Sequence, residues 1–403
     1  MNPEPLEERR LRHQLDVQAQ QIMRVLSHHR VPATVAGGVV RPRLISFDLQ
    51  TQLAAGLERV RGLKDDLIKA LGVGDVSVVR EEGQWRLRVG RPDDAPVPLL
   101  RLLASLPDLP PLTAAVGMAH GGQPVLLRFG ANRIKHALIA GEPGAGKTCL
   151  LRTIAAGLAL TNRQAALQLL VLDPRGLGEG ENGAPHPLRP LVYLPHVLTD
   201  PSDTPEACAA VVHFLAEEME FRRRERVQWP RIVALIDHVL TLIDESGSQT
   251  QHDLLRLLQY GAAAGIHLVM ATDRAEAPFL MDRTLRVGVS ARLVGRLQDA
   301  TAARKVAGVA LDGAPAPYGE GDFRAIVGND VTYFQAAYIG DYDLSMGLSK
   351  LTAADRPRLL AQPYHPRPRL ERDKGAAAKA FRWREGAVDL DDPDAGEQEE
   401  QAK

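Results

Sequence analysis

The segment with the clearest chemical meaning follows the pattern G-x-x-x-x-G-K-[ST] and consists of Gly141, Glu142, Pro143, Gly144, Ala145, Gly146, Lys147 and Thr148. A strand-like stretch (HALIA) precedes it and a helical stretch (CLLRTIAAGLAL) follows, and this context makes the match specific. The glycines let the backbone aim its amides at a phosphate, Lys147 reaches the terminal phosphates and Thr148 binds Mg²⁺. The sequence therefore predicts a P-loop that binds ATP and Mg²⁺, with a plain glycine-rich turn as the alternative.

A second acidic residue is needed to hold the magnesium ion and its water. Asp237 fits because it ends an apolar strand-like stretch, RIVALID, about ninety residues after Lys147. A strand-ending aspartate without a metal is the alternative. The next residue is His238, at a position where we expect a P-loop ATPase to carry a glutamate that activates water.

The elements that must position these residues lie between residues 113 and 345, where strand-like and helical stretches alternate. The strand-like stretches are HALIA, LQLLVLD, RIVALID, IHLVMATD, ARLVGRL and VTYFQAAYI. Strands separated by helices indicate a mostly parallel sheet covered on both faces. We therefore predict an α/β ATPase domain over residues 113–345.

The first 91 residues have a different pattern. Residues 1–30 are predicted to form a helical lead-in, since apolar positions recur at helical spacing over 5–29. Residues 31–91 are typical of a small α+β domain. Its expected elements are a strand at 43–49, a short helix at 62–71 and a hairpin of strands 76–80 and 85–89.

Two further segments are predicted to lack regular structure. Residues 92–112 contain six prolines, which favours a connector. Residues 346–403 form a charged tail that we expect to be disordered. Within it, 356–384 has nine Lys or Arg against two acids, and 385–403 has eight acids against one lysine.

Composition sets limits on function. The 403 residues are enough for two or three domains of roughly 150 residues each. The formal charge of −1 gives no overall attraction to nucleic acid, so DNA binding would need a local patch. The two cysteines, Cys149 and Cys208, exclude a disulfide framework and a four-cysteine zinc site. No apolar run approaches the roughly 18 to 20 residues of a membrane span, so we expect a cytoplasmic protein without a membrane segment.

Several blocks together resemble the motor portion of the FtsK/SpoIIIE family of double-stranded DNA translocases, from about residue 8 to 345. In the ATPase part they are HALIAGEPGAGKT, LLVLDPRG, LPHVLTDP, AEEMEFRRRE, AAAGIHLVMATDR and GEGDF, and upstream they are LERVRGLKDDLIKALGVGDVSV and PPLTAAVGMAHGGQPVLLRF. The resemblance implies a RecA-like P-loop NTPase core that assembles into a homo-oligomeric, hexameric ring. It also implies that double-stranded DNA passes through the pore and that ATP hydrolysis drives movement along it.

The chain departs from the family at two positions near the nucleotide. The family usually has Asp-Glu at the end of the acidic strand, where this chain has Asp237-His238, and Ala-Thr-Gln-Arg where this chain has Ala-Thr-Asp273-Arg. Three hypotheses stay open: Asp273 is the base, in one version paired with His238; His238 is the sole base; or hydrolysis is weak or absent. The candidate catalytic residues are Lys147, Asp237, His238 and Asp273.

The expected DNA contacts also depart from the family. The segment from Asp244 to Asp253, which we expect to be a loop facing DNA, contains no Lys or Arg. The run Arg222-Arg223-Arg224 is either a solvated helix face or a contact to DNA or to a neighbouring subunit's nucleotide. Further candidates for contact with a neighbouring subunit's nucleotide are Arg292, Arg296 and Arg304. The alternative function is a nucleotide-binding structural or regulatory subunit with little or no hydrolysis.

Overall fold

The computed structural model of the chain describes residues 6–40, 44–51, 54–73, 76–81, 84–90, 96–106, 108–119, 122–130, 132–178, 185–297, 299–309 and 320–353. The chain divides into two compact units. One contains residues 1–97 with the short segments 118–123 and 312–316, and the other contains the remaining residues.

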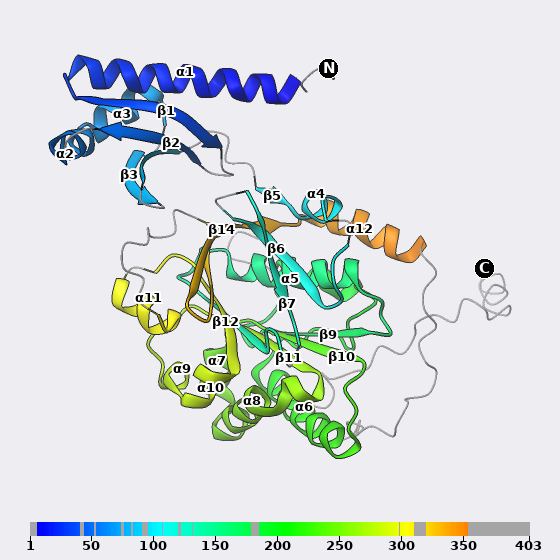
Figure 1. Cartoon of the computed structure of the whole chain (residues 1–403). Helices are drawn as coiled ribbons and strands as arrows, with labels where there is room; N and C mark the ends of the chain where they lie inside the picture. Colours follow the sequence, from blue (N-terminus) through cyan, green and yellow to red (C-terminus); the bar gives the residue numbers. More distant parts are fainter. Residues whose placement is uncertain are drawn as a thin grey trace. The chain divides into compact units, whose positions relative to one another are not determined.

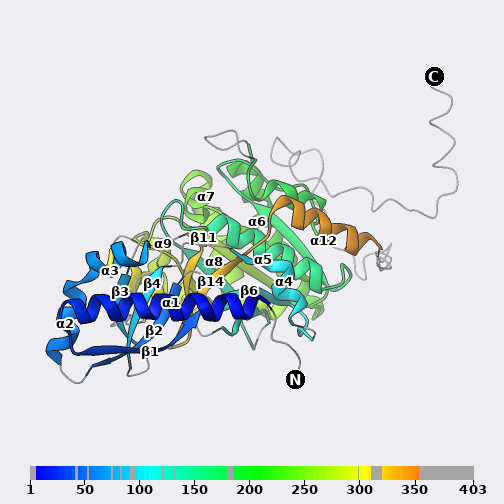
Figure 2. The ribbon, with the colours of Figure 1, turned by 90° about the horizontal axis from the view of Figure 1, so that it is seen from above.

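The first unit is a helix packed on a small antiparallel sheet. Its elements are α1 (Leu6–His28), β1 (Ala33–Val40), β2 (Leu44–Thr51), α2 (Ala54–Gly62), α3 (Lys64–Leu71), β3 (Val76–Glu81) and β4 (Gln84–Gly90). The strands pair in the order β1-β2-β4-β3, and α1 lies alongside β1, as Figures 1 and 2 show. Apolar residues of α1 join those of the strands in one core, formed by Ile22, Leu26, Ile45, Phe47, Leu87 and Val89 among others.

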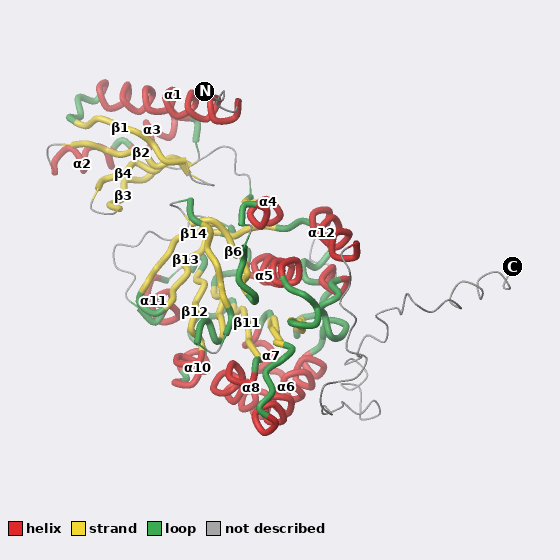
Figure 3. Tube along the Cα trace, turned by 45° about the vertical axis from the view of Figure 1, so that its right-hand side comes forward, coloured by secondary structure: helices red, strands yellow, loops and turns green. Residues whose placement is uncertain are grey.

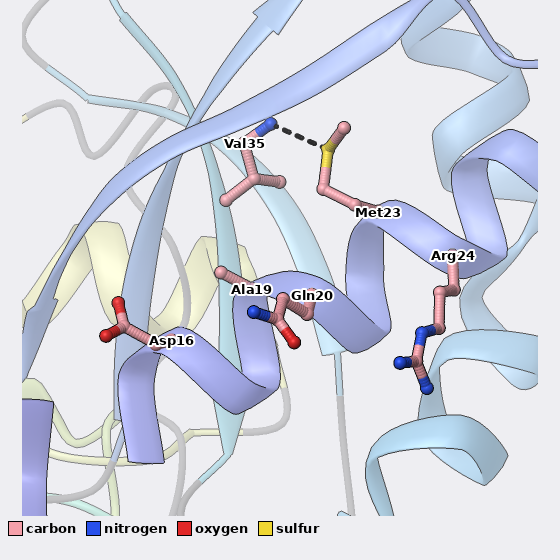
Figure 4. Close-up of a pocket in the computed structure, with 6 residues that line it drawn as sticks. All are labelled: Asp16, Ala19, Gln20, Met23, Arg24 and Val35. Atoms are coloured by element: carbon pink, nitrogen blue, oxygen red, sulfur yellow. Dashed lines mark hydrogen bonds between the residues drawn. The ribbon is translucent and has the colours of Figure 1, made fainter. Parts of the chain in front are cut away.

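The helix predicted over 5–29 and the strands near 43–49, 76–80 and 85–89 are thus present as α1, β2, β3 and β4. Strand β1 and helix α2 add to what the sequence indicated. A hollow between α1 and β1, where the Val35 amide donates to Met23 Sδ at 3.3 Å, contains none of the predicted site residues (Figure 4).

The second unit contains a ten-stranded sheet. Its strands are β5 (Val97–Pro98), β6 (Thr113–Ala119), β7 (Pro124–Arg128), β8 (His136–Ala140), β9 (Leu167–Leu172), β10 (Arg231–Ile236), β11 (Ile266–Thr272), β12 (Val289–Val294), β13 (Asp322–Val327) and β14 (Asp330–Tyr338). The order is β7-β6-β14-β13-β12-β8-β11-β10-β9, with β5 beside β14. Neighbours from β12 to β9 are parallel, whereas β13 is antiparallel to both of its neighbours. The predicted mostly parallel α/β core is therefore confirmed, and β6, β7 and β13 extend it.

Helices cover both faces of this sheet, as the parallel connections require. They are α4 (Leu99–Ala104), α5 (Lys147–Thr161), α6 (Pro205–Glu225), α7 (Val239–Ser246), α8 (Ser248–Tyr260), α9 (Pro278–Met281), α10 (Arg283–Gly288), α11 (Ala300–Ala307) and α12 (Asp341–Ala353), with short 3₁₀ helices η1 (Arg189–Tyr193) and η2 (Gly261–Ala264). Helices α6, α7 and α8 pack together on one side, and α5 lies on the other with α4 and α12 (Figures 1 and 3). No helix among these described segments is long and apolar enough to cross a membrane.

Three sequence predictions need correction. Regular structure does occur within 92–112, since helix α4 lies there. Pro98 directly precedes this helix, and its Leu99 and Leu102 are buried. The predicted tail begins too early, because residues 346–353 belong to α12, where Leu344 is buried; residues 354–403 lie outside the described part of the chain. The expected loop from Asp244 to Asp253 is instead the end of α7 and the start of α8, joined at Gly247.

Candidate nucleotide site

The candidate site lies at one edge of the parallel sheet, where four neighbouring strands end. The P-loop follows β8, Asp273 follows β11, Asp237 follows β10 and Asp173 follows β9. Because parallel strands end at the same edge, residues far apart in the sequence meet there. Every strand residue of β8, β10 and β11 is buried except Arg231, so the sheet provides a rigid base for these side chains.

The P-loop has the backbone conformation that the glycines predict. Gly144 and Gly146 have φ of 78° and 92°, a region that other residues rarely adopt. A Cβ at Gly146 would lie 3.0 Å from the backbone nitrogen of Gly321, so the close approach also requires glycine. Helix α5 begins at Lys147 directly after this turn, and a helix N-terminus presents unpaired amides that suit a phosphate.

Lys147 is buried at the base of the loop. Its Nζ donates to the carbonyl oxygen of Glu142 at 2.9 Å, which leaves further ammonium hydrogens for a ligand. Burial lowers the pKa of Lys147, against the opposing charges of Asp237 and Asp273. An ammonium group that has lost water in this way is well suited to a phosphate anion.

Thr148 and Asp237 are in contact. The Thr148 hydroxyl donates to Asp237 Oδ2 at 2.5 Å, which joins the P-loop to the acidic strand. Asp237 is fully buried, and burial followed by the charge of nearby Asp173 raises its pKa. A hydroxyl beside a buried carboxylate is an oxygen donor pair that fits a Mg²⁺ ion which keeps several waters.

His238 is held by the two carboxylates next to it. Its backbone has φ of 48°, and its amide donates to Asp237 Oδ1 at 2.9 Å. Its Nδ1 lies 3.1 Å from Asp173 Oδ1 and 3.6 Å from Asp237 Oδ1. Burial alone would lower the pKa of His238, but the hydrogen bond to Asp173 and the two negative charges outweigh it and raise the pKa.

Asp273 has a different partner. Its Oδ2 lies 3.0 Å from Arg175 Nη2, and Arg175 Nε also donates to Thr241 Oγ1 at 3.2 Å. Burial would raise the pKa of Asp273, but the positive charge of Arg175 outweighs it and lowers the pKa. In this structure Asp273 pairs with Arg175 and His238 with Asp173, so the hypothesis that Asp273 pairs with His238 stays a prediction.

Asp173, Arg175 and His186 are residues of this site that the sequence analysis did not single out. Asp173 and Arg175 lie within the LLVLDPRG block, and an aspartate after an apolar strand is the same signal that identified Asp237. His186 has no such signal, because it comes from an irregular segment and reaches Asp173 only through the fold.

The arginine run on α6 is only partly on the surface. Arg222 is 2% exposed; its Nε contacts Glu218 at 2.7 Å and its Nη1 donates to the carbonyl oxygen of Pro230 at 2.7 Å. Arg222 is therefore neither a solvated residue nor a contact to DNA or another subunit. Arg223 and Arg224 are exposed and pair with Glu220 and Glu225.

The candidates for contact with a neighbouring subunit differ in exposure. Arg296 lies next to the P-loop, with Nε 3.6 Å from Glu142 Oε2, and is 47% exposed at its side chain. Arg304 on α11 is exposed as well. Arg292 is half-buried and donates to the carbonyl oxygen of Arg286 at 3.0 Å, which makes it the least available of the three.

Two family models match separate parts of the chain. The FtsK/SpoIIIE family model matches residues 107–228, and the FtsK alpha domain model matches residues 1–85. The DNA translocase FtsK of Lactiplantibacillus plantarum is 23% identical over 362 residues, which cover 82% of this chain. The match covers 44% of that relative, so this chain spans less than half of its length.

Two solved structures have the same fold. One is the pCW3 conjugation coupling protein TcpA in a monomer form with ATPγS, with a TM-score of 0.54 and 17% identity over 83% of this chain and 99% of that one. The other is the cytoplasmic domain of the type VII secretion ATPase EccC of Thermomonospora curvata, with a TM-score of 0.52 and 21% identity over 64% of this chain and 34% of that one. Together these matches confirm the resemblance and the RecA-like P-loop fold.

Proposed function

We propose that the chain is the motor portion of an ATP-driven translocase acting on double-stranded DNA, and the match of the FtsK/SpoIIIE family model to residues 107–228 supports this. The observation that carries this proposal is the contact between Thr148 and Asp237, with Lys147 buried beside them. In this proposal these residues bring together the phosphate-binding and metal-binding halves of a nucleotide site.

In this proposal the P-loop residues Gly141 to Thr148 hold the triphosphate of ATP. Lys147 neutralises its terminal phosphates, and Thr148 and Asp237 bind Mg²⁺ through their side-chain oxygens. When bound, Mg²⁺ would polarise the phosphate oxygens and withdraw negative charge from them. The buried carboxylate of Asp237 gains a neutralising partner in the same step, which offsets its desolvation.

We further propose that the motor acts as a hexameric ring in the cytoplasm with duplex DNA in its pore. Binding would be chiefly to phosphates and would weaken as salt rises. The exposed acids at the end of α7 argue for weak contact there, although Asp244 is paired with Arg274 Nη2 at 2.6 Å. Arg296 and Arg304, which are exposed, are our candidates for contact with the nucleotide of a neighbouring subunit.

A second candidate function is a nucleotide-binding structural or regulatory subunit that hydrolyses ATP slowly or not at all. His238 stands where the family usually has glutamate, and Asp273 is held by Arg175, so neither position offers an unpaired carboxylate toward water. In this candidate, ATP would control assembly of the ring instead of powering movement.

Steady-state ATP turnover with and without long duplex DNA separates the two candidates. The motor predicts turnover that DNA stimulates and that Lys147→Ala removes. The regulatory subunit predicts ATP binding without turnover, together with nucleotide-dependent assembly that Asp237→Ala removes. Turnover that appears only in His238→Glu would also favour the regulatory subunit.

A further inference from the structure

Two hydrogen-bond donors and a third nitrogen lie around the buried carboxylate of Asp173. Its Oδ1 accepts from the Arg175 amide at 3.0 Å and faces His238 Nδ1 at 3.1 Å, and its Oδ2 lies 3.3 Å from His186 Nε2. Asp173 is fully buried at the end of β9, next to the strand that carries His238. Burial alone would raise the pKa of this carboxyl, but the hydrogen bonds to Oδ1 and the two nearby imidazole rings outweigh it and keep the pKa below its usual range, so it stays ionised.

The same contacts determine which ring nitrogens carry hydrogen. The Leu188 amide donates to His186 Nδ1 at 3.3 Å, so the hydrogen of that ring is on Nε2 and faces Asp173. On His238 the nitrogen that faces Asp173 is Nδ1, so Nδ1 carries a hydrogen, and in the neutral ring the lone pair is on Nε2. His238 Nε2 has no hydrogen-bond partner within the described part of the chain.

We propose that Asp173 is a positioning residue, which holds the His238 ring through Nδ1 so that Nε2 accepts a hydrogen bond from the attacking water in place of the family's glutamate. The proposal rests on the proposed hydrolysis of ATP. In that reaction the water oxygen forms a bond to the γ-phosphorus, and the bond from the γ-phosphorus to the bridging oxygen breaks. ADP keeps that electron pair, and the water proton is released with the phosphate product.

Two further observations favour His238 over Asp273 for this role. Asp273 is held by Arg175 at 3.0 Å, and its charge is thereby neutralised. His238 has φ of 48°, a strained conformation for a residue other than glycine, which persists at functional sites when neighbours enforce it. The Asp237 and Asp173 carboxylates enforce it by binding the backbone amide and the ring of His238.

The first test does not depend on activity. Ring-¹⁵N histidine is incorporated into the full chain, and NMR is recorded at about pH 8.5, where imidazole is normally neutral. The spectrum reports which nitrogen of His238 carries hydrogen. The signal that disappears in His238→Gln is assigned to His238. We expect hydrogen on Nδ1, and a shift to Nε2 in Asp173→Asn, whose amide would donate to Nδ1. Asp253→Asn, which removes an equally buried acid 2.9 Å from the exposed His213, should leave the His238 signal unchanged. Hydrogen on Nε2 of the unmodified protein, or no change in Asp173→Asn, overturns the proposal.

The second test is a double-mutant cycle in ATP turnover. Asp173→Asn should lower kcat about tenfold or more with little change in KM. In the His238→Glu background the same change should alter kcat less than about twofold, because the ring that Asp173 holds is gone. An equal effect in both backgrounds means a general structural role and overturns the proposal, as does turnover that appears only with His238→Glu. If no variant hydrolyses ATP, the proposed function fails, and the NMR result still decides whether Asp173 holds His238.

Discussion

At the scale of residues, the site is built from buried ionisable groups. Burial lowers the pKa of the Lys147 ammonium and raises the pKa of the Asp237 carboxyl, so both groups are less readily charged here than in water. A triphosphate would stabilise the first charge and a divalent cation the second. Binding of ATP with Mg²⁺ should therefore stabilise the folded chain as well as occupy the site.

Lys147→Ala removes the ammonium group that faces the phosphates. We expect the affinity for ATP to fall at least about tenfold, a loss of about 1.4 kcal/mol or more, because a charge-assisted bond in a dry site is lost. Binding of a fluorescent ATP analogue measures it. Lys135→Ala, at the exposed start of β8, is the control. Equal affinities for both variants would contradict this role of Lys147.

Arg222→Met removes the arginine that pairs with the buried Glu218 at 2.7 Å. Such a change should destabilise the fold by about 3 to 5 kcal/mol, whereas Arg224→Met, at a side chain 72% exposed, should change stability by less than about 1 kcal/mol. Replacing both Arg222 and Glu218 by apolar residues should recover most of the loss. Urea denaturation measures all of these, and similar midpoints for Arg222→Met and Arg224→Met would be inconsistent with the buried pair.

Single residues differ in how far their sequence context predicts them. Lys147, Thr148 and Asp237 were predictable because their chemistry requires a local pattern, and the structure brings them together. Arg222 was not, because three consecutive arginines look alike in sequence while one in each helical turn faces the core. The contacts of Asp173 with His186 and with His238 depend on separate connections of the fold, and no local pattern indicates them.

At the scale of elements, β8 and β11 carry two histidines inside the sheet. His136 Nδ1 accepts from the Leu268 amide at 3.0 Å, and His267 Nδ1 contacts the carbonyl oxygen of Lys135 at 2.8 Å. Burial and then the charge of His267 lower the pKa of His136 to about 3, and burial lowers the pKa of His267 to about 4. Both rings are therefore neutral in the folded protein at neutral pH.

Stability should therefore depend on pH through these strands. The unfolded chain binds a proton at each histidine below about pH 6.5, whereas the folded chain does so only near pH 3 to 4, so stability falls as pH falls through this window. At pH 5 the loss from His136 should be about 2 kcal/mol relative to neutral pH.

The variant His136→Asn tests this dependence. Its side-chain oxygen keeps an acceptor for the Leu268 amide but does not bind a proton in this range. Denaturation at pH 7.5 and at pH 5 should show a decrease in stability that is about 2 kcal/mol smaller than in the unmodified protein. His252→Asn, at an exposed position of α8, serves as the control. An unchanged decrease in His136→Asn would exclude His136 as its source.

At the scale of the whole molecule, the strongest apolar strands were the most predictable elements. Strands β8, β9, β10 and β11 are buried runs of aliphatic residues, and each was expected from the sequence. Strand β6 was not, because its sequence, TAAVGMA, is rich in small residues that give little strand signal. Helix α4 was missed because the prolines around it suggested a connector, although a proline just before a helix is compatible with it.

The charged tail, residues 354–403, lies outside the described residues, and its sequence supports one prediction. Its acidic end, 385–403, could compete with DNA for basic residues of the same chain. Deletion of 385–403 should then tighten binding of duplex DNA at low salt and have less effect at high salt. A filter-binding or fluorescence titration at two salt concentrations measures it, and an unchanged affinity at low salt would rule out this competition.

The most direct test of the motor proposal is movement along DNA. A short third strand is bound to one end of a linear duplex, and its displacement by the protein is followed with ATP, with a non-hydrolysable analogue, and with the Lys147→Ala variant. The proposal predicts displacement with ATP only, and none with Lys147→Ala. Binding of ATP and DNA without displacement by the unmodified protein would contradict it and leave the regulatory subunit as the function of this chain.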